Sequence, residues 1–293
     1  MPDIAAPSIR GGTAPGAATP SGVAVVGRWG DPTREPARFL EGAFAALPDP
    51  WFRRMPGRET FGLGQDLVVK RFRGDSWREW WHEWTRAGRR RSPARREFEN
   101  LAALRELGLE VPAPLAWAEE AAACAPPFGA EESGGRSALV MERLAHDEHL
   151  RARLARSAPG ESRAWREPLA EMVARLHGGG WFHRDLYLQH CIVLDPARRR
   201  LGLLDCGRAR KSLSVPRRWI VKDLAQLLHS TPSAVGARAR LSWFVAYARQ
   251  RGLPRGPGRR ELLLAVAAKA RRLAAHAPRH VDPRTAGAED PPS

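Results

Sequence analysis

Residues 181–195 read WFHRDLYLQHCIVLD, and residues 203–209 read LLDCGRA. The first stretch carries a His-Arg-Asp tripeptide and the second an Asp-Cys-Gly tripeptide. The apolar runs at 191–194 and 201–204 have the length and composition of short β-strands, so we expect these strands to flank two acid-bearing loops. The interpretation of the whole chain depends on this pair of loops.

The composition indicates an intracellular protein with a strongly positive surface. The 293 residues are 43% hydrophobic, which is enough to bury a substantial core in one large domain or two lobes. The formal net charge of +16 is expected to attract polyanions such as phosphorylated lipids, nucleotides or nucleic acid. The cysteines Cys124, Cys191 and Cys206 are too few and too scattered for a disulfide framework or a zinc site.

The two ends of the chain have the composition of disordered segments. Residues 1–22 are rich in Gly, Ala, Pro, Ser and Thr, and residues 277–293 form a polar tail that contains proline. No basic start followed by an apolar stretch is present, so we expect no signal peptide. No apolar run reaches the length of about 18 residues that a membrane-spanning helix needs. We expect a cytoplasmic protein that binds a membrane, if at all, at its surface.

Strand-like and helix-like patterns are segregated between the two halves of the chain. Residues 23–142 contain a hairpin pattern at 58–73, an amphipathic helix at 94–107 and a strand at 137–142. The second half, at 143–276, is mostly helical, with helices expected at 163–177, 219–230, 236–250 and 259–275. These patterns predict an α+β protein with a small β-rich N-lobe, a helical C-lobe and a cleft between the lobes.

The two acidic loops have the order and spacing of the catalytic and metal-binding loops of protein kinases. Asp185 is the candidate catalytic residue that orients an acceptor hydroxyl, and Asp205 is the candidate ligand of Mg²⁺ across the phosphates of ATP. We assign structural roles to His183, which would hold the loop, and to Asp223, which would anchor it. The alternative, a chance tripeptide, is weakened because Asp205 follows at the expected distance.

Kinases also place a lysine on the phosphates of ATP and pair it with a glutamate. Lys70 ends the β-rich run LVVK and is the candidate lysine. Glu97 lies on the apolar face of the 94–107 helix and is preferred as its partner over Glu99, which points elsewhere. In the alternative interpretation, the lysine is a solvated strand residue and both glutamates are solvated.

Other positions of the ATP site are less clearly marked. His190 stands where kinases use an Asn on the metal, and it is expected to touch the metal, to act through water or a phosphate, or to pack. Residues 58–64, RETFGLG, lie where a glycine-rich phosphate loop would be, but two glycines at this spacing are a weak signal and an ordinary β-turn is the preferred interpretation. The backbone near Glu142 and Leu144 is the candidate adenine site, from its order in the chain alone.

Two departures from protein kinases argue against a protein substrate. Tyr187 stands where protein serine/threonine kinases have a lysine, two residues after the catalytic aspartate. Only 18 positions separate Asp205 from Asp223, which is too short for a peptide-binding activation segment. A small molecule or a sugar is therefore the expected acceptor.

The same stretches resemble a more specific family. HRDLYLQHCIVLD, LLDCGRARK and RRWIVKDLAQLLHS resemble the lipopolysaccharide core kinases, the family of Kdo and heptose kinases. His190 matches the family's His at the Asn position, and 217–219 match its short basic segment. REFENLAALRELGLEVPAPLAW resembles the family's helix and following strand. Across residues 55–250 the resemblance implies a protein-kinase-like fold, ATP and Mg²⁺, and an anionic, lipid-linked saccharide acceptor with Asp185 as the catalytic residue.

A Trp- and Arg-rich segment at 75–96 is a candidate membrane contact on the cytoplasmic face of the inner membrane. Trp77, Trp80, Trp81 and Trp84 fall at one helical face. Six arginines follow: Arg86, Arg89, Arg90, Arg91, Arg95 and Arg96. Tryptophan favours the bilayer interface and arginine its anionic headgroups. Alternatively, the tryptophans pack on the small lobe and the arginines are solvated.

Other functions remain open from the sequence. An aminoglycoside-type or other small-molecule kinase and an atypical protein kinase are alternatives within the enzyme class. A pseudokinase binding module would explain His190 and the Asp-Cys-Gly turn, but Lys70, Asp185 and Asp205 are all retained. We expect no specific nucleic-acid binding, because no known nucleic-acid-binding motif accompanies the positive charge.

Overall fold

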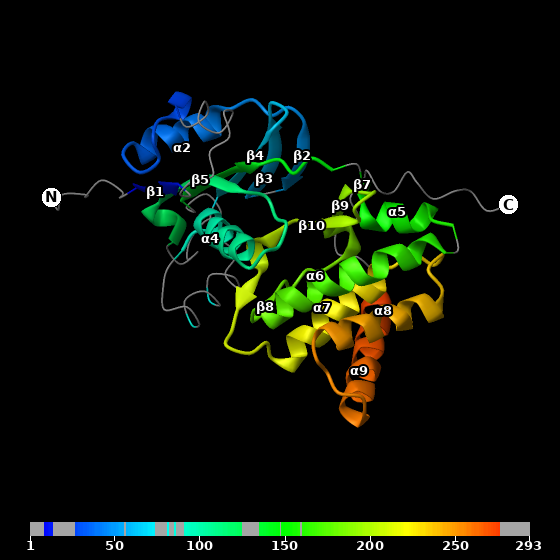
Figure 1. Cartoon of the computed structure of the whole chain (residues 1–293). Helices are drawn as coiled ribbons and strands as arrows, with labels where there is room; N and C mark the ends of the chain where they lie inside the picture. The colour runs from blue at the N-terminus through cyan, green and yellow to red at the C-terminus, as the bar shows by residue number, and fades with distance from the viewer. Residues whose placement is uncertain are drawn as a thin grey trace.

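The computed structural model describes residues 9–13, 27–55, 57–73, 81, 85, 91–124, 135–146, 148–158 and 160–275. Figure 1 shows a β-rich lobe that carries the N-terminal half and a helical lobe that carries the C-terminal half. This arrangement confirms the predicted α+β, two-lobed fold. None of the helices in the described ranges combines the length and hydrophobicity that crossing a membrane requires.

The N-lobe contains one antiparallel sheet with the strand order β1-β5-β6-β4-β3-β2. Its strands are β1 (Ile9–Thr13), β2 (Trp51–Met55), β3 (Arg58–Leu63), β4 (Leu67–Arg73), β5 (Pro114–Glu120) and β6 (Arg136–Glu142). The predicted hairpin at 58–73 is the β3–β4 pair, and the predicted strand at 137–142 is β6. Both predictions are confirmed.

Two helices cover opposite faces of this sheet (Figure 1). Helix α2 (Pro36–Ala45) packs Phe39 against Leu67 and Val69 of β4, while helix α4 (Pro93–Glu106) lies on the other face with Phe72. Successive strand residues point to opposite faces, so Lys70 shares the α4 face with Phe72. The alternation along β4 therefore directs Lys70 toward the interlobe cleft.

Helix α4 has clear start and stop signals in the sequence. Ser92 caps it by accepting a hydrogen bond from the Arg95 amide, Pro93 occupies the first turn, and Gly108 follows the helix with φ of 78°. Eight of its residues are buried, including the polar side chains Glu97 and Asn100. The helix lies between the sheet and the acidic loops, so it can link the two lobes.

The C-lobe is built from helices around two small sheets, with the strand orders β10-β9-β7 and β11-β8. Its helices are α5 (Leu150–Arg156), α6 (Arg166–Gly178), α7 (Arg217–Ser230), α8 (Ala237–Gln250) and α9 (Pro257–Ala274). Its strands are β7 (Glu148–His149), β8 (Trp181–Phe182), β9 (Cys191–Asp195), β10 (Arg200–Leu203) and β11 (Arg210–Lys211). The four predicted helices correspond to α6 to α9, and the two predicted strands correspond to β9 and β10. These predictions are confirmed.

The sequence did not indicate α2, β2, α5 or β1. The structure differs from the expected disordered arm at 1–22, because Ile9–Thr13 pair with β5. A Cβ atom on Gly11 would lie 2.1 Å from the Pro32 carbonyl oxygen, so the small residues that suggested disorder instead permit a close edge contact. The rest of that arm, and the expected tail at 277–293, lie outside the described residues.

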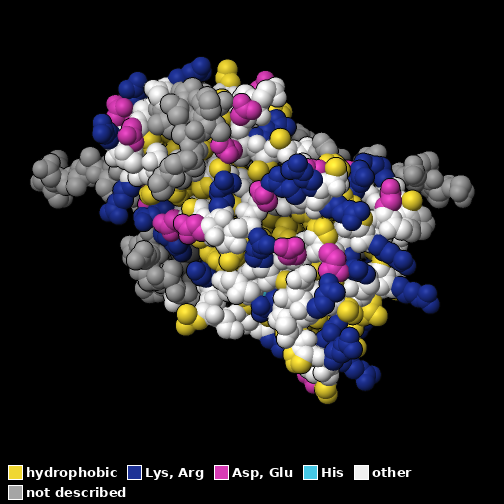
Figure 2. All heavy atoms as spheres, in the orientation of Figure 1, with side chains coloured by type: hydrophobic (Ala, Val, Ile, Leu, Met, Phe, Trp, Pro, Cys, Tyr) yellow, Lys and Arg dark blue, Asp and Glu magenta, His cyan; other side chains and the backbone are white. Residues whose placement is uncertain are grey.

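The proposed membrane segment is only partly described. Trp81 is 44% exposed, while Trp77, Trp80 and Trp84 lie outside the described residues, as do Arg86, Arg89 and Arg90. Arg95 pairs with Glu99 and Glu119, and Arg96 is buried. These two arginines are therefore packed into the N-lobe and are not part of a solvated basic surface. Figure 2 shows other Lys and Arg side chains spread over the face of both lobes that is in view, with acidic side chains among them.

Candidate active site

A cavity of about 430 Å³ lies between the lobes. Its wall takes residues from β3, β4, α4, the segment after β6 and both acidic loops; the ones considered below are Arg58, Lys70, Glu97, Leu144, His190 and Asp205. Most of the candidate site residues, which are far apart in the sequence, therefore meet at one cavity.

Lys70 is the centre of the charged wall. Its Nζ donates to Glu97 Oε1 in a short, buried contact and lies 3.4 Å from Asp205 Oδ1. Glu99 instead accepts hydrogen bonds from Arg91 and Arg95, so Glu97 is the glutamate that contacts the lysine. One ammonium is thus held between carboxylates from α4 and from the Asp-Cys-Gly loop.

The Asp-Cys-Gly loop is held against α4 by a second set of contacts. Asn100 Nδ2 donates to the carbonyls of Cys206 and Ala209, each at 3.0 Å, and Arg96 Nε donates to the Gly207 carbonyl at 3.3 Å. A Cβ on Gly207 would approach Glu97 Oε2 to 2.8 Å, so any larger residue there would shift the Glu97 carboxylate that contacts Lys70. A movement of α4 would therefore move the loop.

Asp205 has an unusual backbone and an unusual charge environment. Its φ of 57° and ψ of 51° place it in the left-handed region, which aspartate tolerates better than most residues. Burial would raise the pKa of its carboxyl, but the charges of Lys70 and Arg58 hold that pKa well below its usual value. Asp205 therefore stays ionised and can bind a cation.

Side chains of helix α7 hold the backbone of the catalytic loop through hydrogen bonds. Asp223, fully buried, accepts hydrogen bonds from the His183 amide at 2.7 Å and the Arg184 amide at 2.8 Å. Gln226 bonds the amide of Leu186 and the carbonyl of Arg184. The spacing of the two α7 residues puts them on one helical face, so a short piece of helix fixes the backbone that precedes and follows Asp185.

Asp185 itself makes an ion pair at the cleft. Its Oδ2 accepts a hydrogen bond from Arg208 Nη1 at 2.8 Å. Lys222, half-buried on α7, is the second cation whose charge interacts with Asp185; burial first lowers its pKa, and the Asp185 charge opposes that shift. The surroundings of the candidate catalytic carboxylate are therefore positive.

The two histidines of the loop have different roles. His183 is fully buried, its Nε2 donates to the Leu204 carbonyl at 3.0 Å, and burial lowers its pKa. It is thus a neutral tether between the two acidic loops. His190 Nδ1 donates to the Asp185 carbonyl at 2.7 Å, which leaves Nε2 as the nitrogen that can face a ligand in the cavity.

Residues 58–64 do not form a glycine-rich phosphate loop, which agrees with the preference for an ordinary turn, found at 64–66. These residues form strand β3 and its end, and the turn that corresponds to a phosphate loop comes before them, between β2 and β3. The two glycines Gly62 and Gly64 suggested a loop, but Gly62 lies in the strand and faces the Asp49 carbonyl, where a Cβ would come within 2.8 Å. The cysteines Cys191 and Cys206 are buried and burial raises the pKa of each thiol, of Cys191 to about 12, as expected of packing residues.

The candidate adenine site lies at the opposite end of the cavity, where Glu142 and Leu144 line the wall. The Glu142 amide donates to the Ala113 carbonyl, and the Leu144 carbonyl accepts from His146 Nδ1. These two groups are already paired, so an adenine ring would need the other backbone groups of this segment. The assignment of Glu142 and Leu144 to ATP binding stays a prediction.

The donor set is compatible with a magnesium ion shared with phosphates. Mg²⁺ prefers oxygen ligands and usually takes only one or two carboxylates from the protein. Asp205 supplies an ionised carboxylate in the cavity, and the other candidate metal ligand from the sequence, His190, offers only nitrogen. Within the described ranges no cluster of three or more His, Cys, Asp or Glu could hold a metal alone. Mg²⁺ would therefore depend on phosphate and water oxygens.

Sequence reasoning missed several residues of the site. Arg58 contacts Asp205, and Arg208 contacts Asp185. Asn100 holds the Asp-Cys-Gly loop. The hairpin pattern contained a signal for Arg58, since a turn at 64–66 pairs it with Phe72 and puts it on the face of Lys70. Arg208 and Asn100 had no such signal, because their contacts join segments about a hundred residues apart or depend on the loop conformation.

The chain is similar in sequence to known kinases, in agreement with the kinase-like arrangement of its charged residues. The chain is 29% identical over 210 residues to the lipopolysaccharide core heptose(I) kinase WaaP of Pseudomonas aeruginosa, covering 67% of this chain and 74% of that protein. It is 35% identical over 80 residues to the Escherichia coli K12 protein of the same name, covering 26% of this chain and 30% of that protein.

A solved structure of WaaP in complex with acyl carrier protein aligns with a TM-score of 0.59 and 26% identity, covering 80% of this chain and 92% of that one. The fold is therefore protein-kinase-like. Residues 44–247 match the lipopolysaccharide kinase (Kdo/WaaP) family, and because that match spans most of the chain, the protein is a kinase that belongs to this family.

Proposed function

We propose that the protein transfers the terminal phosphoryl group of ATP to a hydroxyl of a heptose or Kdo residue in the inner core of lipopolysaccharide, or of a similar lipid-linked glycan. The observation that carries the proposal is the meeting of Lys70, Glu97 and Asp205 in one cavity, with Asp185 on the adjoining loop. Phosphoryl transfer requires a cation on the phosphates, a carboxylate for the metal and a carboxylate near the hydroxyl.

Each of these side chains has one part in the proposed reaction. Lys70, held by Glu97, binds the phosphates of ATP, and Asp205 would hold Mg²⁺, which would neutralise phosphate charge. Asp185 accepts a hydrogen bond from the attacking hydroxyl and takes its proton as the hydroxyl oxygen bonds to the γ-phosphorus of ATP, while the bond from that phosphorus to the β,γ-bridging oxygen breaks and ADP leaves. Arg208 holds Asp185 Oδ2, and the other carboxylate oxygen is the one that can accept the hydroxyl while this ion pair stays in place.

The charges around Asp185 favour an anionic acceptor. Arg208 and Lys222 flank the carboxylate, and Arg184, the residue directly before it in the chain, adds a third cation. A carboxylate or phosphate on the acceptor would be attracted to these cations while its hydroxyl meets Asp185. A neutral sugar or a cationic aminoglycoside would gain nothing from them.

Mass spectrometry of core oligosaccharide from cells with and without the protein tests this function. We expect one phosphate per core to disappear when the gene is deleted and to return with the wild type, but not with Asp185→Asn. The purified protein should transfer phosphate from ATP to dephosphorylated core in the presence of Mg²⁺. An unchanged core together with transfer to an aminoglycoside or a peptide would contradict the proposed acceptor.

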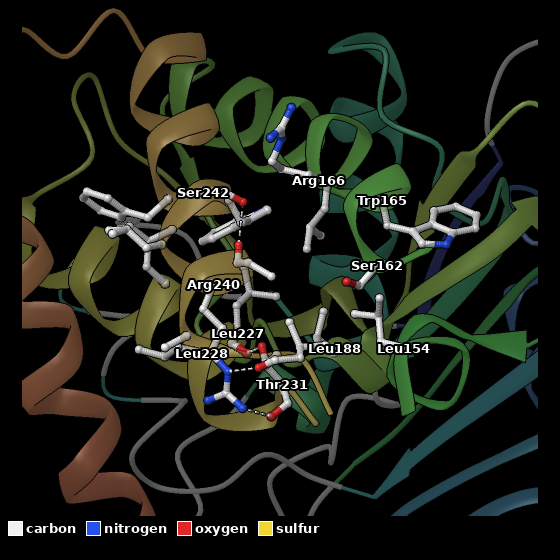
Figure 3. Close-up of a pocket in the computed structure, with 18 of the residues that line it drawn as sticks. Leu154, Ser162, Trp165, Arg166, Leu188, Leu227, Leu228, Thr231, Arg240 and Ser242 are labelled. Carbon is white, nitrogen blue, oxygen red and sulfur yellow. Dashed lines mark hydrogen bonds between the residues drawn. The ribbon is translucent and has the colours of Figure 1, made fainter. Parts of the chain in front are cut away.

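A second proposal concerns a partner. Because WaaP has been solved with acyl carrier protein, we propose that this chain also binds an acyl carrier protein. A separate apolar cavity of about 280 Å³ in the C-lobe supports this proposal (Figure 3). In Figure 3, Leu154, Trp165, Leu188 and Leu227 surround the space, and Arg166 lies at its edge.

The chemistry of this cavity suits an acyl chain better than a polar ligand. Its lining is dominated by leucine, and the nearby Arg240 guanidinium is bound to the carbonyls of Thr231, Pro232 and Val235, so it leaves the interior apolar. Acyl carrier proteins are acidic, and the +16 chain is complementary in charge.

Filling the C-lobe cavity tests this partner. Ala239→Phe, from the rim, should reduce binding of acylated carrier protein at least about tenfold while ATP binding stays unchanged, since the lost space removes burial of several methylenes. Leu213→Phe, at a fully exposed position, is the matched control. Equal binding of acylated and unacylated carrier protein, or no effect of Ala239→Phe, would contradict an acyl site.

A further inference from the structure

The turn between β2 and β3 has few backbone groups with which to hold phosphates. Met55 pairs with Arg58, so only Pro56 and Gly57 connect the strands. Kinases usually cover the phosphates of ATP with a longer glycine-rich loop. A proline has no backbone N–H, and Gly57 has a φ of 72°, which lets so short a turn close. Another donor is needed at this end of the cavity.

Arg58, the first residue of β3, directly follows this turn and can supply the donor. It lies opposite Phe72 on β4, and Thr60 lies opposite Lys70. Paired strand residues share a face of the sheet, and residues two apart on one strand do so as well. The Arg58 guanidinium and the Lys70 ammonium therefore lie on the same face as diagonal neighbours and line the same cavity.

The contacts of Arg58 hold its guanidinium in the cavity. Nη2 donates to Asp205 Oδ1 at 2.7 Å, the same oxygen that Lys70 approaches to 3.4 Å. The guanidinium carbon lies 5.5 Å from the centre of the Phe72 ring, and the side chain is only 27% exposed. The buried Nε has no hydrogen-bond partner among the described residues. One donor of the guanidinium is thus held ready without an acceptor.

We propose that Arg58 is a triphosphate-binding residue that replaces the backbone donors of a glycine-rich loop. A planar guanidinium can give two parallel hydrogen bonds to one phosphate, and its Nε–H is one of the donors in that arrangement. In the nucleotide complex the Asp205 carboxylate serves the metal, and Arg58 turns its donors from Asp205 to the phosphates. Arg58 has this role if ATP is the phosphoryl donor, as proposed above.

Direct nucleotide binding tests the role of Arg58 independently of the acceptor. A fluorescent ATP analogue is titrated into wild-type protein, Arg58→Gln, Arg58→Lys and the control Arg54→Gln, with and without Mg²⁺. Arg54 is 75% exposed and pairs with Glu59 outside the cavity. Loss of two charge-assisted hydrogen bonds should weaken the binding of ATP to Arg58→Gln at least about 100-fold.

The variants separate a phosphate contact from a structural role. Adenosine binding should change less than about twofold in Arg58→Gln, because adenosine has no phosphate for the guanidinium to contact. Arg58→Lys should recover part of the ATP affinity, since it keeps the charge and loses the fork. Arg54→Gln should bind both ligands like the wild type.

Three results would overturn the proposal. ATP affinity that is unchanged in Arg58→Gln would show that Arg58 does not meet the phosphates. Tighter ATP binding by that variant would show that Arg58 only competes for Asp205, and an equal loss of adenosine and ATP binding would show a structural role. Wild-type protein that binds ATP but phosphorylates no core oligosaccharide would contradict the proposed acceptor and leave the Arg58 result standing.

Discussion

The anchoring of the catalytic loop by Asp223 makes a quantitative prediction. Its two carboxylate oxygens accept the amides of His183 and Arg184 at 2.7 and 2.8 Å, and its side chain is completely buried. The Asp223→Ala substitution would leave both amides without an acceptor in a place that water does not reach. It would also leave His177, 3.4 Å from Asp223 Oδ2, without that neighbour.

The expected cost follows from the number of bonds lost. Each buried donor that loses its acceptor costs about 1–3 kcal/mol, so two donors cost about 2–6 kcal/mol of the free energy of unfolding. Domains are stable by about 5–15 kcal/mol, so Asp223→Ala should remove a large part of the stability of the C-lobe. Asp223→Asn keeps one acceptor oxygen, so its free energy of unfolding should lie between those of the wild type and Asp223→Ala.

Urea unfolding followed by tryptophan fluorescence measures this cost. The matched control is Asp195→Ala, which removes an exposed turn contact to the Arg198 amide and should cost less than about 1 kcal/mol. In variants that remain folded, kcat should fall more than ATP affinity, because the loop and not the nucleotide site is loosened. If the free energy of unfolding falls no further in Asp223→Ala than in Asp195→Ala, Asp223 does not anchor the loop.

Three further predictions concern Lys70 and Asp205, which line the cavity, and Lys222, whose charge acts on Asp185. Lys70→Met should lower kcat/KM at least about 100-fold in a coupled ATPase or transfer assay, because the phosphates lose the cation that Glu97 positions. Lys222→Met should lower kcat about 10-fold with little change in the KM for ATP, because its charge acts on Asp185 and not on the nucleotide; a change confined to KM would contradict this. The folded pKa of Asp205 lies below its usual 3.8, so its contribution to stability is present above that pH and is lost as the pH falls through the folded pKa. The stability difference between wild type and Asp205→Asn should therefore be constant from pH 7 to 5 and shrink below about pH 4 in urea titrations.

Much of the fold was predictable because local patterns and long-range packing agree. The α4 helix has a Ser-Pro start, an apolar stripe and a terminal glycine, and all of these survive in the structure. Helix α2 was missed because its apolar residues lie between Pro36 and a Pro-rich stretch, which read as loop. Strand β1 was missed because its pairing with β5 depends on small residues in a sequence of low complexity.

The part of the candidate site that could be predicted consists of residues that follow the order of kinase motifs along the chain. Lys70, Glu97 and Asp205 are named by motif order, and the structure places them in contact. Arg58 was not named, although the register of the 58–73 hairpin places it on the face of Lys70. Arg208 was not named, because the sequence contains many arginines and its contact with Asp185 depends on the conformation of the two loops.

The packing of Arg184 helps to hold the loop that carries Asp185, although the segment between Asp205 and Asp223 is short. In protein kinases, phosphorylation of a long activation loop orders it through arginine contacts. Here the Arg184 guanidinium lies 5.4 Å from the centre of the Trp219 ring, and Trp219 stacks on Phe182 with centroids 5.0 Å apart. The segment after Asp205 also pairs with β8, directly before the catalytic loop. The packing of Arg184 on Trp219 and the β8–β11 pair therefore hold the chain that leads into the catalytic loop, in addition to the hydrogen bonds that Asp223 accepts from the His183 and Arg184 amides.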